Sequence, residues 1–481
     1  MSTPPEKPHV LIVGAGIGGL LLGNLLEKSN VPYTIFERAA AVKPLGSCIS
    51  VGPNLLAVFE QLGIYEHFLA ISIPMNEISY FKPNMTAYKA ADYRPVEGIA
   101  GYAYRVVARP IYYDLLLKQI PPHKIHFGKR VLGISEKHEK VTVETSDNAT
   151  WEGDILVGAD GAYSTVRQRL YERLVAEGKL PKSDQEELPF SAICLVGQTT
   201  VLDPNEYPCL TLPSCHFNVV LGYEGPYTAA TMTTSEQTIC WMTLRHLPKT
   251  TKSAMDKRAE ENLEWGPQGA QAMYDETRDL PVQLNDGKKR LIGELYDRTP
   301  KELISKIALD EKVFDTWYSG RTVLIGDACH KVHPSRGQGG VNAMHDAIVL
   351  ANLLYALPSS TSADIVKIFE EYKKERHPIA MESYNDAHLA SKMDGRGFFG
   401  ALVVSIATSV PKWLWIRVLT SALKARPQVG FLPEIKDKGT VAPTDSPSFL
   451  KAKALFEKTQ QAAFVSDKSA HAVSTPADLM K

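Results

Sequence analysis

The sequence predicts an α/β fold in which a parallel sheet opens the chain, a separate antiparallel sheet is inserted, and the chain then returns to the first domain. Three observations support this prediction. A strand-like run, a glycine turn and a helix-like stretch occupy residues 9–26 and lead to a second strand-like run. Residues 190–244 hold strand-like runs without intervening helices. A buried-strand pattern followed by a long helix then recurs at residues 322–357.

The first elements follow in the order that a βαβ unit requires. Residues 9–13 are β-branched and apolar, and residues 20–26 are an apolar helix-like stretch. Residues 31–37 form the second strand, so the opening sheet is expected to be parallel. Residues 106–119 predict a helix, because Pro110 stands in a first turn, where its missing N–H costs no hydrogen bond.

The middle of the chain predicts a change of architecture. Further strands are expected within residues 125–158, and the charged, proline-punctuated residues 171–189 indicate a crossing between domains. The inserted antiparallel sheet is predicted by four runs, at residues 190–201, 216–221, 227–233 and 238–244.

Net charge, the amino terminus and the cysteine spacing argue against a nucleic-acid-binding protein, a secreted protein and a metal site. The formal net charge is -1, so the chain has no long-range field that would indicate a nucleic-acid partner. Residues 1–8 lack the apolar region of a secretory signal peptide, and the six scattered cysteines predict free thiols and a cytoplasmic location. Cys329, His330 and His333 lie close in sequence, but no fourth ligand has a supportive spacing, so we expect no metal site.

The glycine turn after the first strand has a dinucleotide-binding pattern. Gly14, Gly16 and Gly19 satisfy GxGxxG, in which glycines let backbone amides and a helix amino terminus approach a pyrophosphate. Glu37 ends the second strand, where its carboxylate can accept hydrogen bonds from ribose hydroxyls and repel a 2′-phosphate. FAD and NAD share this fingerprint, so both cofactors stay open at this point.

Two further motifs distinguish between these cofactors. Residues 154–161, with Ser164 and Arg167, form one, and residues 321–330, with Pro334, form the other. In order and spacing they resemble the DG and GD motifs of the p-hydroxybenzoate hydroxylase-like family, the single-component (group A) flavin monooxygenases. The resemblance implies one non-covalent FAD and transient use of NADPH or NADH, and it assigns Asp160 to cofactor handling.

The resemblance implies further flavin contacts near the carboxyl edge of the sheet. Asp327 follows a buried strand, where its carboxylate can accept a bond from a ribityl hydroxyl. Gly339 and Gly340 open a helix whose unpaired amides would face the flavin pyrimidine edge.

Four more residues match cofactor-contacting positions of that family. Arg109 matches an arginine on the flavin side of the ribityl chain, and Arg38 matches a cofactor-contacting arginine. Ser50 and Val51 belong to a loop that resembles the one whose backbone approaches the isoalloxazine ring. Pattern alone identifies no catalytic side chain.

With this resemblance the expected architecture is a Rossmann-type FAD-binding domain with an inserted antiparallel β-sheet substrate domain and a carboxyl-terminal helical segment. The FAD-binding domain is expected at residues 1–189 and 316–395, and about residues 72–105 are expected to contribute to the substrate domain. The substrate domain itself is expected at residues 190–315, and the helical segment with a loosely ordered polar tail at residues 396–481.

The carboxyl-terminal third narrows the resemblance. Residues 413–417 (WLWIR), 426–428 (RPQ) and 431–433 (FLP) resemble the fungal paxilline-type FAD-dependent monooxygenases, which are epoxidases of terpenoid biosynthesis. This implies a secondary-metabolism oxidoreductase that epoxidises or hydroxylates a lipophilic, prenylated or terpenoid molecule with O2. Hydroxylation of a phenolic or other aromatic ring remains an alternative, as does a flavin-dependent polyprenyl reductase or dehydrogenase.

Two points stay open at this stage. A non-enzymatic escort protein on the same fold would be expected to lose flavin-contacting residues, and Glu37, Arg109 and Asp327 are all present, which argues against it. The apolar residues 398–410 are too short to span a bilayer, but residues 398–419 together are compatible with a segment on a membrane surface or with a core helix.

Overall fold

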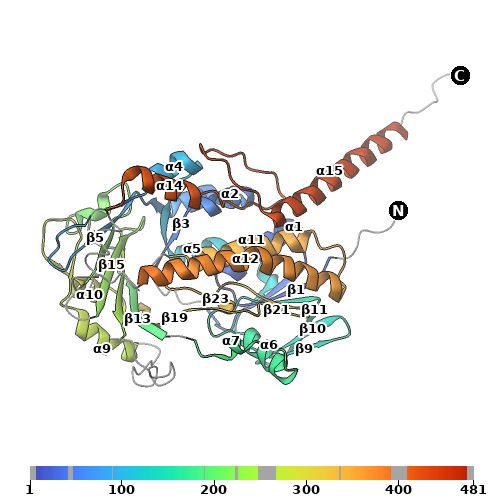
Figure 1. Ribbon diagram of the computed structural model, residues 1–481, viewed down its shortest axis with the longest axis horizontal. Coiled ribbons are helices and arrows are strands. Elements are labelled where there is room, and N and C mark those ends of the chain that lie inside the picture. Colours follow the sequence, from blue (N-terminus) through green and yellow to red (C-terminus); the bar gives the residue numbers. More distant parts are fainter. Residues whose placement is uncertain are drawn as a thin grey trace.

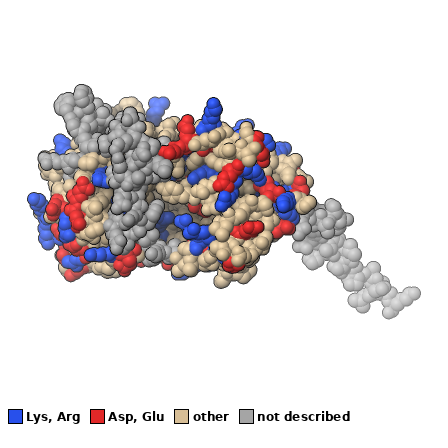
Figure 2. Space-filling model, turned by 90° about the horizontal axis from the view of Figure 1, so that it is seen from below, with Lys and Arg blue, Asp and Glu red and all other residues tan. Residues whose placement is uncertain are grey.

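The computed structural model describes residues 7–41, 47–88, 90–188, 190–222, 226–247, 267–334, 337–391 and 409–473. Figure 1 shows a body in which the helices α11 and α12 run beside the sheets, while the helix α15 extends away from it. On the face that Figure 2 presents, Lys and Arg are interspersed with Asp and Glu. That face therefore carries no patch of one sign.

A six-stranded sheet forms the first layer of the structure. Its order is β21-β22-β12-β1-β2-β8, and β1 pairs in parallel with both β12 and β2. The four central strands are buried along their whole length, which explains their uninterrupted apolar sequences. The bounds are β1 Val10–Val13, β2 Tyr33–Phe36, β8 Ile125–His126, β12 Ile155–Gly158, β21 Tyr318–Ser319 and β22 Thr322–Leu324.

Two helices that are distant in sequence pack together over this sheet. The helix α1 (Ile17–Ser29) lies against α11 (Gly339–Tyr355), which in turn contacts α12 (Ser362–Ser391). A Cβ added at Gly18 would lie 3.2 Å from the Cβ of Ala343, so a small residue is needed where α1 crosses α11. This packing brings the first glycine turn close to the start of α11.

One predicted helix begins later than expected. The sequence predicted a helix over residues 106–119, but α5 spans Arg109–Leu117 and the strand β7 (Arg105–Ala108) precedes it. The β-branched Val106 and Val107 pair with β3 (Cys48–Val51) and β4 (Ser72–Pro74). Val106 and Val107 are therefore part of a strand, because their pairing with β3 and β4 outweighs the helical pattern of the residues that follow.

A seven-stranded sheet forms the second layer of the structure. Its order is β19-β13-β16-β15-β14-β5-β6. The expectation of a wholly antiparallel sheet is wrong at one place, because β14 pairs in parallel with β5, a strand that comes much earlier in the chain. The bounds are β5 Glu77–Phe81, β6 Ala91–Asp92, β13 Phe190–Gln198, β14 Phe217–Val220, β15 Tyr227–Thr233, β16 Ile239–His246 and β19 Ser305–Asp310.

The remaining elements are short or peripheral. The helices are α2 Pro53–Leu62, α3 Tyr65–Ala70, α4 Pro95–Ala100, α6 Thr165–Ala176, α7 Lys182–Gln185, α9 Pro267–Thr277 and α10 Ile292–Asp297. The strands are β9 Val131–Lys137, β10 Lys140–Thr145, β11 Thr150–Gly153, β17 Pro281–Val282, β18 Arg290–Leu291, β20 Lys312–Val313 and β23 His330–Lys331.

Two helices follow in the carboxyl-terminal segment, α14 (Lys412–Ala422) and α15 (Pro447–Val473). The prediction of a loosely ordered tail is wrong for the start of α15. Phe449 and Ala452 are buried there, and Ser448 donates hydrogen bonds from its N–H and its hydroxyl to Glu375 of α12. Residues 398–408 lie outside the described residues. In the ranges that are described, no helix is both long and apolar enough to cross a bilayer.

Candidate functional site

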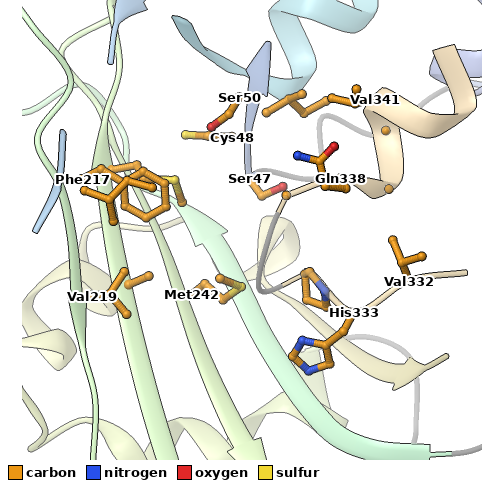
Figure 3. Close-up of a pocket in the computed structure, with 18 of the residues that line it drawn as sticks. Ser47, Cys48, Ser50, Phe217, Val219, Met242, Val332, His333, Gln338 and Val341 are labelled. Carbon is orange, nitrogen blue, oxygen red and sulfur yellow. The ribbon is translucent and has the colours of Figure 1, made fainter. Parts of the chain in front are cut away.

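A cavity of about 1580 Å³ lies between the six-stranded sheet domain and one face of the seven-stranded sheet. It exceeds the ~300–1,000 Å³ of a typical ligand pocket, so it has room for a dinucleotide cofactor beside a substrate. Residues of the first glycine turn, of β3, of the loop before α11 and of α14 also line it. Figure 3 shows lining residues from both sides, namely Ser47, Ser50 and Gln338 on one and Phe217, Val219 and Met242 on the other.

The glycines of the first turn have different tasks. Gly14 has φ of 106°, and a Cβ there would lie 2.4 Å from the carbonyl oxygen of Ala159. A Cβ at Gly19 would lie 2.1 Å from the oxygen of Gly14, so both residues are needed for the turn itself. Gly16 lines the cavity, and its Cβ would meet no atom nearer than 4.0 Å. Gly16 therefore leaves space that a ligand can fill.

Glu37 lies beside this turn, directly after β2. Its Oε2 accepts the N–H of Ala15 at 3.0 Å, and its Oε1 accepts the N–H of Ala39 at 2.8 Å. Each carboxylate oxygen keeps a lone pair for another donor, as a ribose hydroxyl would require. Arg38 is exposed and is not among the cavity-lining residues, so its contact with a cofactor stays a prediction.

Asp327 lines the cavity from a short turn after β22. The turn begins at Gly326, whose φ is 61° and whose N–H donates to Asp346 Oδ2 at 2.8 Å. This bond holds the backbone of the turn, so the position of Asp327 depends on a residue of α11.

The amino terminus of α11 faces the same cavity. Gly339 and Gly340 line it, and a Cβ on either residue would meet nothing within 4 Å. The protein itself therefore does not require glycine there, whereas a closely approaching ligand would. The first amides of α11 and its positive dipole end suit an anionic or hydrogen-bond-accepting group.

Arg109 and Ser50 also reach the cavity. Arg109 begins α5, and its N–H donates to the carbonyl of Ser47 at 2.8 Å. Ser50 lines the cavity, while its neighbour Val51 is fully buried in the core, because successive residues of a strand point to opposite faces. Val51 can therefore approach a ligand only through its backbone.

Asp160 has a role that the motif did not reveal. Its Oδ1 accepts the hydroxyl of Ser164 at 2.5 Å and its Oδ2 accepts the N–H of Val166 at 3.1 Å, at the start of α6. Burial raises its pKa, which those hydrogen bonds oppose. Its neighbours Ala159 and Gly161 line the cavity, whereas Asp160 does not. Direct contact between Asp160 and a cofactor stays a prediction.

A buried ion-pair network lies behind Asp327. Asp346 Oδ2 lies 2.5 Å from His330 Nε2, and Asp346 Oδ1 accepts Arg376 Nε at 2.8 Å. Burial opposes ionisation of Asp346, but His330 and Arg376 hold its pKa well below its usual range. Ligating atoms of Cys329, His330 and Asp346 lie within 4.8 Å of one another. The Arg376 charge on the same carboxylate disfavours a cation there.

One face of the seven-stranded sheet forms the other wall of the cavity. Alternate residues of its strands line the cavity, and most are apolar: Val196, Phe217, Val219, Leu221, Ala230, Met232, Met242, Leu244, Ile307 and Leu309. This wall can therefore bury a large apolar surface. The polar candidates Tyr227 and Arg245 pair on the opposite face of the sheet, and Tyr223 lies outside the described residues.

Several lining residues carried no recognisable signal in sequence. Gln338, His333 and Lys331 line the cavity beside the predicted positions. Their place in the sequence, directly after the GD motif, was the available clue. The six cysteines are free thiols; five of them are buried and Cys48 is partly exposed.

Comparison with protein families and curated proteins gives consistent results. The family model described as "FAD binding domain" matches residues 7–194 and 225–387. The chain is 27% identical over 449 residues to the FAD-dependent monooxygenase ausM of Emericella nidulans, covering 91% of this chain and 90% of that protein. It is 28% identical to the FAD-dependent monooxygenase paxM of Penicillium paxilli, covering 81% of this chain and 79% of that protein.

Solved structures share the fold. The Klebsiella pneumoniae HpxO structure with FAD and uric acid has a TM-score of 0.66 at 19% identity, covering 87% of this chain and 97% of that chain. The 2,6-dihydroxypyridine-3-hydroxylase of Arthrobacter nicotinovorans has a TM-score of 0.63 at 17% identity, covering 82% of this chain and 95% of that chain. These likenesses confirm the expected hydroxylase-type fold.

Proposed function

The chain belongs to the FAD binding domain family and is an FAD-dependent monooxygenase, and from this premise we propose that it epoxidises or hydroxylates a lipophilic substrate. The substrate is prenylated or terpenoid, O2 supplies the oxygen atom, and NADPH or NADH supplies the electrons. The apolar sheet wall of the cavity carries this proposal, because it can bury a hydrocarbon skeleton next to the cofactor site.

The residues of the cavity fit FAD. Gly16 leaves room for the pyrophosphate after β1, and Glu37 offers acceptors to the ribose. We propose that Asp327 accepts from the ribityl chain and that the amides of Gly339 and Gly340 face the flavin pyrimidine edge. When bound, FAD supplies the redox chemistry that activates O2.

The other predicted site residues act at the edges of this arrangement. We propose that Arg109 lies along the ribityl chain and that Ser50, with the backbone of Val51, borders the flavin ring. Gly14 and Gly19 shape the pyrophosphate turn, and Arg38 stands at the exposed adenosine end. Asp160 holds the DG loop through Ser164.

The domain division follows from these assignments. We propose that residues 1–189 and 316–395 form the FAD-binding domain and residues 190–315 the substrate domain, with part of residues 72–105 added to the latter. Residues 396–481 form the carboxyl-terminal helical segment. The chain's own contribution to the reaction is to bury the substrate, orient it and exclude water.

The helix α14 carries a second proposal about partners. Trp413, Leu414 and Val418 expose 66%, 37% and 50% of their surface, and the basic Lys412 and Arg417 accompany them. Lys412, Leu414 and Val418 also line the cavity. We propose that this helix rests on a membrane surface with acidic headgroups, so that a lipophilic substrate enters the cavity from the bilayer.

Turnover in labelled oxygen gas tests the proposed function. The FAD-loaded protein should consume NADPH faster with prenylated substrates, and mass spectrometry should find one labelled oxygen atom in the product. Label on an aromatic ring would indicate a phenolic hydroxylase. Anaerobic saturation of a double bond would indicate a reductase, and label taken from water would contradict a monooxygenase reaction on that substrate.

A further inference from the structure

The cavity wall formed by the seven-stranded sheet is mostly apolar but becomes polar at one corner. Ala230 and Met232 of β15 and Met242 and Leu244 of β16 make it apolar along most of the two strands. Continuing the same alternation, β15 presents Thr228 and β16 ends with His246, and both line the cavity. This corner therefore places a hydroxyl and an imidazole at the end of an apolar wall.

Thr228 and His246 are already hydrogen-bonded to each other. The Thr228 hydroxyl lies 3.1 Å from His246 Nε2. If Nε2 carries the proton, the hydroxyl accepts a hydrogen bond from Nε2–H and can donate a hydrogen bond to a ligand. If Nε2 is bare, the hydroxyl donates to it and can accept a bond from a ligand instead. Thr228 can therefore donate to a hydroxyl or carbonyl oxygen in the first tautomer, and accept from a hydroxyl in the second.

A second imidazole faces this corner from the cofactor side. His333 follows Asp327 in the loop before α11, is 1% exposed and lines the cavity. Figure 3 shows it across from Val219 and Met242 of the sheet. Burial lowers its pKa to about 4, and the positive fields of His246 and His388 act in the same direction. His333 is therefore neutral near pH 7, so one of its ring nitrogens is a donor and the other an acceptor.

The ion pair of Lys331 and Asp310 favours a neutral ligand over an acid. Lys331 also lines the cavity, but its ammonium lies 3.3 Å from Asp310 Oδ2, and Tyr163 donates to the same carboxylate oxygen at 2.9 Å. The charge of Lys331 is thus compensated within the protein. Lys306 is a second lysine that lines the same cavity, and it is buried, so a carboxylic acid is included among the probes below.

We propose that Thr228, His246 and His333 form a hydrogen-bonding subsite for a neutral hydroxyl or carbonyl oxygen of an otherwise apolar substrate. The subsite fixes the end of the substrate that lies on the sheet corner, and the apolar wall then aligns the hydrocarbon part beside the flavin position. This inference rests on the proposed function for the lipophilic class, but the subsite itself is a matter of binding and not of turnover.

Binding of three matched probes to the FAD-loaded protein tests the subsite without NADPH. The probes are geranylgeraniol, the corresponding hydrocarbon and the corresponding carboxylic acid, and flavin absorbance changes report their dissociation constants. We expect the alcohol to bind about tenfold more tightly than the hydrocarbon, as one or two hydrogen bonds would give. Thr228→Val and His333→Phe should each reduce this ratio about threefold to tenfold and leave hydrocarbon binding within about twofold.

The matched control is Met242→Leu, which changes the same wall without removing a polar atom and should leave the ratio unchanged. Thr228→Val keeps the side-chain shape, so it remains informative if His333→Phe lowers FAD content or thermal stability. Equal binding of alcohol and hydrocarbon, or an unchanged ratio in both variants, would overturn the subsite. Preference for the acid would assign the corner to Lys306 instead. If the probes bind as expected but no oxygenated product forms, the subsite stands and the proposed reaction fails.

Discussion

The carboxylate of Asp346 accepts the N–H of Gly326 at 2.8 Å, which fixes the turn carrying Asp327 to the helix α11. The same carboxylate is paired with His330 and Arg376, and all three side chains are 2% exposed or less. Removing one partner of a buried pair leaves the other charge without compensation, which costs far more than breaking a pair on the surface. The geometry of the cofactor site is therefore coupled to the stability of the fold.

We expect Asp346→Asn to lower the free energy of unfolding by about 3–5 kcal/mol, because Arg376 loses its buried counter-ion. Urea unfolding measures this loss, and FAD content should fall with it because the Gly326 turn loosens. Glu172→Gln is the control. Glu172 pairs with Arg169, and their side chains are 61% and 46% exposed. The free energy of unfolding should therefore fall by no more than about 0–1 kcal/mol. Similar losses in the two variants would contradict a special role for Asp346.

The free energy of unfolding should decrease as the pH falls, because buried histidines stay neutral in the folded chain and become protonated in the unfolded chain. Burial lowers the pKa of His345 to about 3 and that of His333 to about 4, so the unfolded chain binds more protons than the folded one below pH ~6.5. The stabilising effect is present above that pH and is lost as the pH falls toward the folded pKa values. Asp346 acts in a separate window, since its contribution is lost only below pH ~4.

His345→Gln tests this linkage, because an amide can replace the bond between His345 Nε2 and the carbonyl of Asn54 without titrating. Between pH 7 and pH 5 the variant should lose about 1–2 kcal/mol less than the wild type. Urea unfolding at both pH values gives the difference. His67 is exposed, so His67→Gln should leave the pH slope unchanged. An equal slope in all three proteins would show that burial does not lower the pKa of His345.

Two glycine substitutions should distinguish a glycine that the turn requires from a glycine that leaves room for the ligand. Gly16→Ala adds a methyl group with no protein atom nearer than 4.0 Å, so stability should be kept while FAD affinity falls about tenfold or more. Gly14→Ala should lower both, because its Cβ would overlap the backbone at Ala159. Thermal unfolding and FAD titration measure the two effects. Gly98→Ala, where a Cβ meets nothing, serves as the control. Unchanged FAD affinity in Gly16→Ala would place the pyrophosphate elsewhere.

The acidic residues at the two ends of the cofactor site should each matter for retention of FAD. Glu37→Ala and Asp327→Ala remove acceptors for hydroxyl groups, and we expect each to weaken FAD binding by about 1–3 kcal/mol. Dissociation constants for FAD measured on apoprotein would show this. Asp114→Asn, an exposed change on α5, should leave the constant as in wild type. Wild-type FAD affinity in either alanine variant would show that its carboxylate does not bind the cofactor.

The sequence predicted the parallel sheet and its glycine turn because both depend on local pattern, as at residues 10–19. It did not reveal the network of Asp346, His330 and Arg376, since these residues meet only when α11, α12 and β23 pack together. Nor did it reveal that the Asp160 carboxylate bonds the start of α6, while the predicted contact of Asp160 with the cofactor stays a prediction. A motif specifies which residue types stand at a turn, and only packing decides which way each side chain points.

The same limit applies to α14, whose sequence allowed either a core helix or a membrane-surface helix. In the structure Trp413 and Val418 are 66% and 50% exposed, so part of the helix faces outward beside the cavity. Burial of those side chains in a lipid interface, with Lys412 and Arg417 near acidic headgroups, would stabilise docking. We therefore expect the protein to sediment with vesicles that contain phosphatidylserine and less with purely zwitterionic vesicles.

Replacing Trp413 and Val418 by Ser should reduce vesicle binding about tenfold or more, since two apolar side chains would no longer enter the interface. Replacing the exposed Leu132 and Val201, which do not belong to α14, should leave vesicle binding as in wild type. FAD content should be equal in both variants, which separates docking from folding. The membrane proposal would be refuted by a wild-type protein that stays in the supernatant with both kinds of vesicle, or by equal sedimentation of the α14 variant.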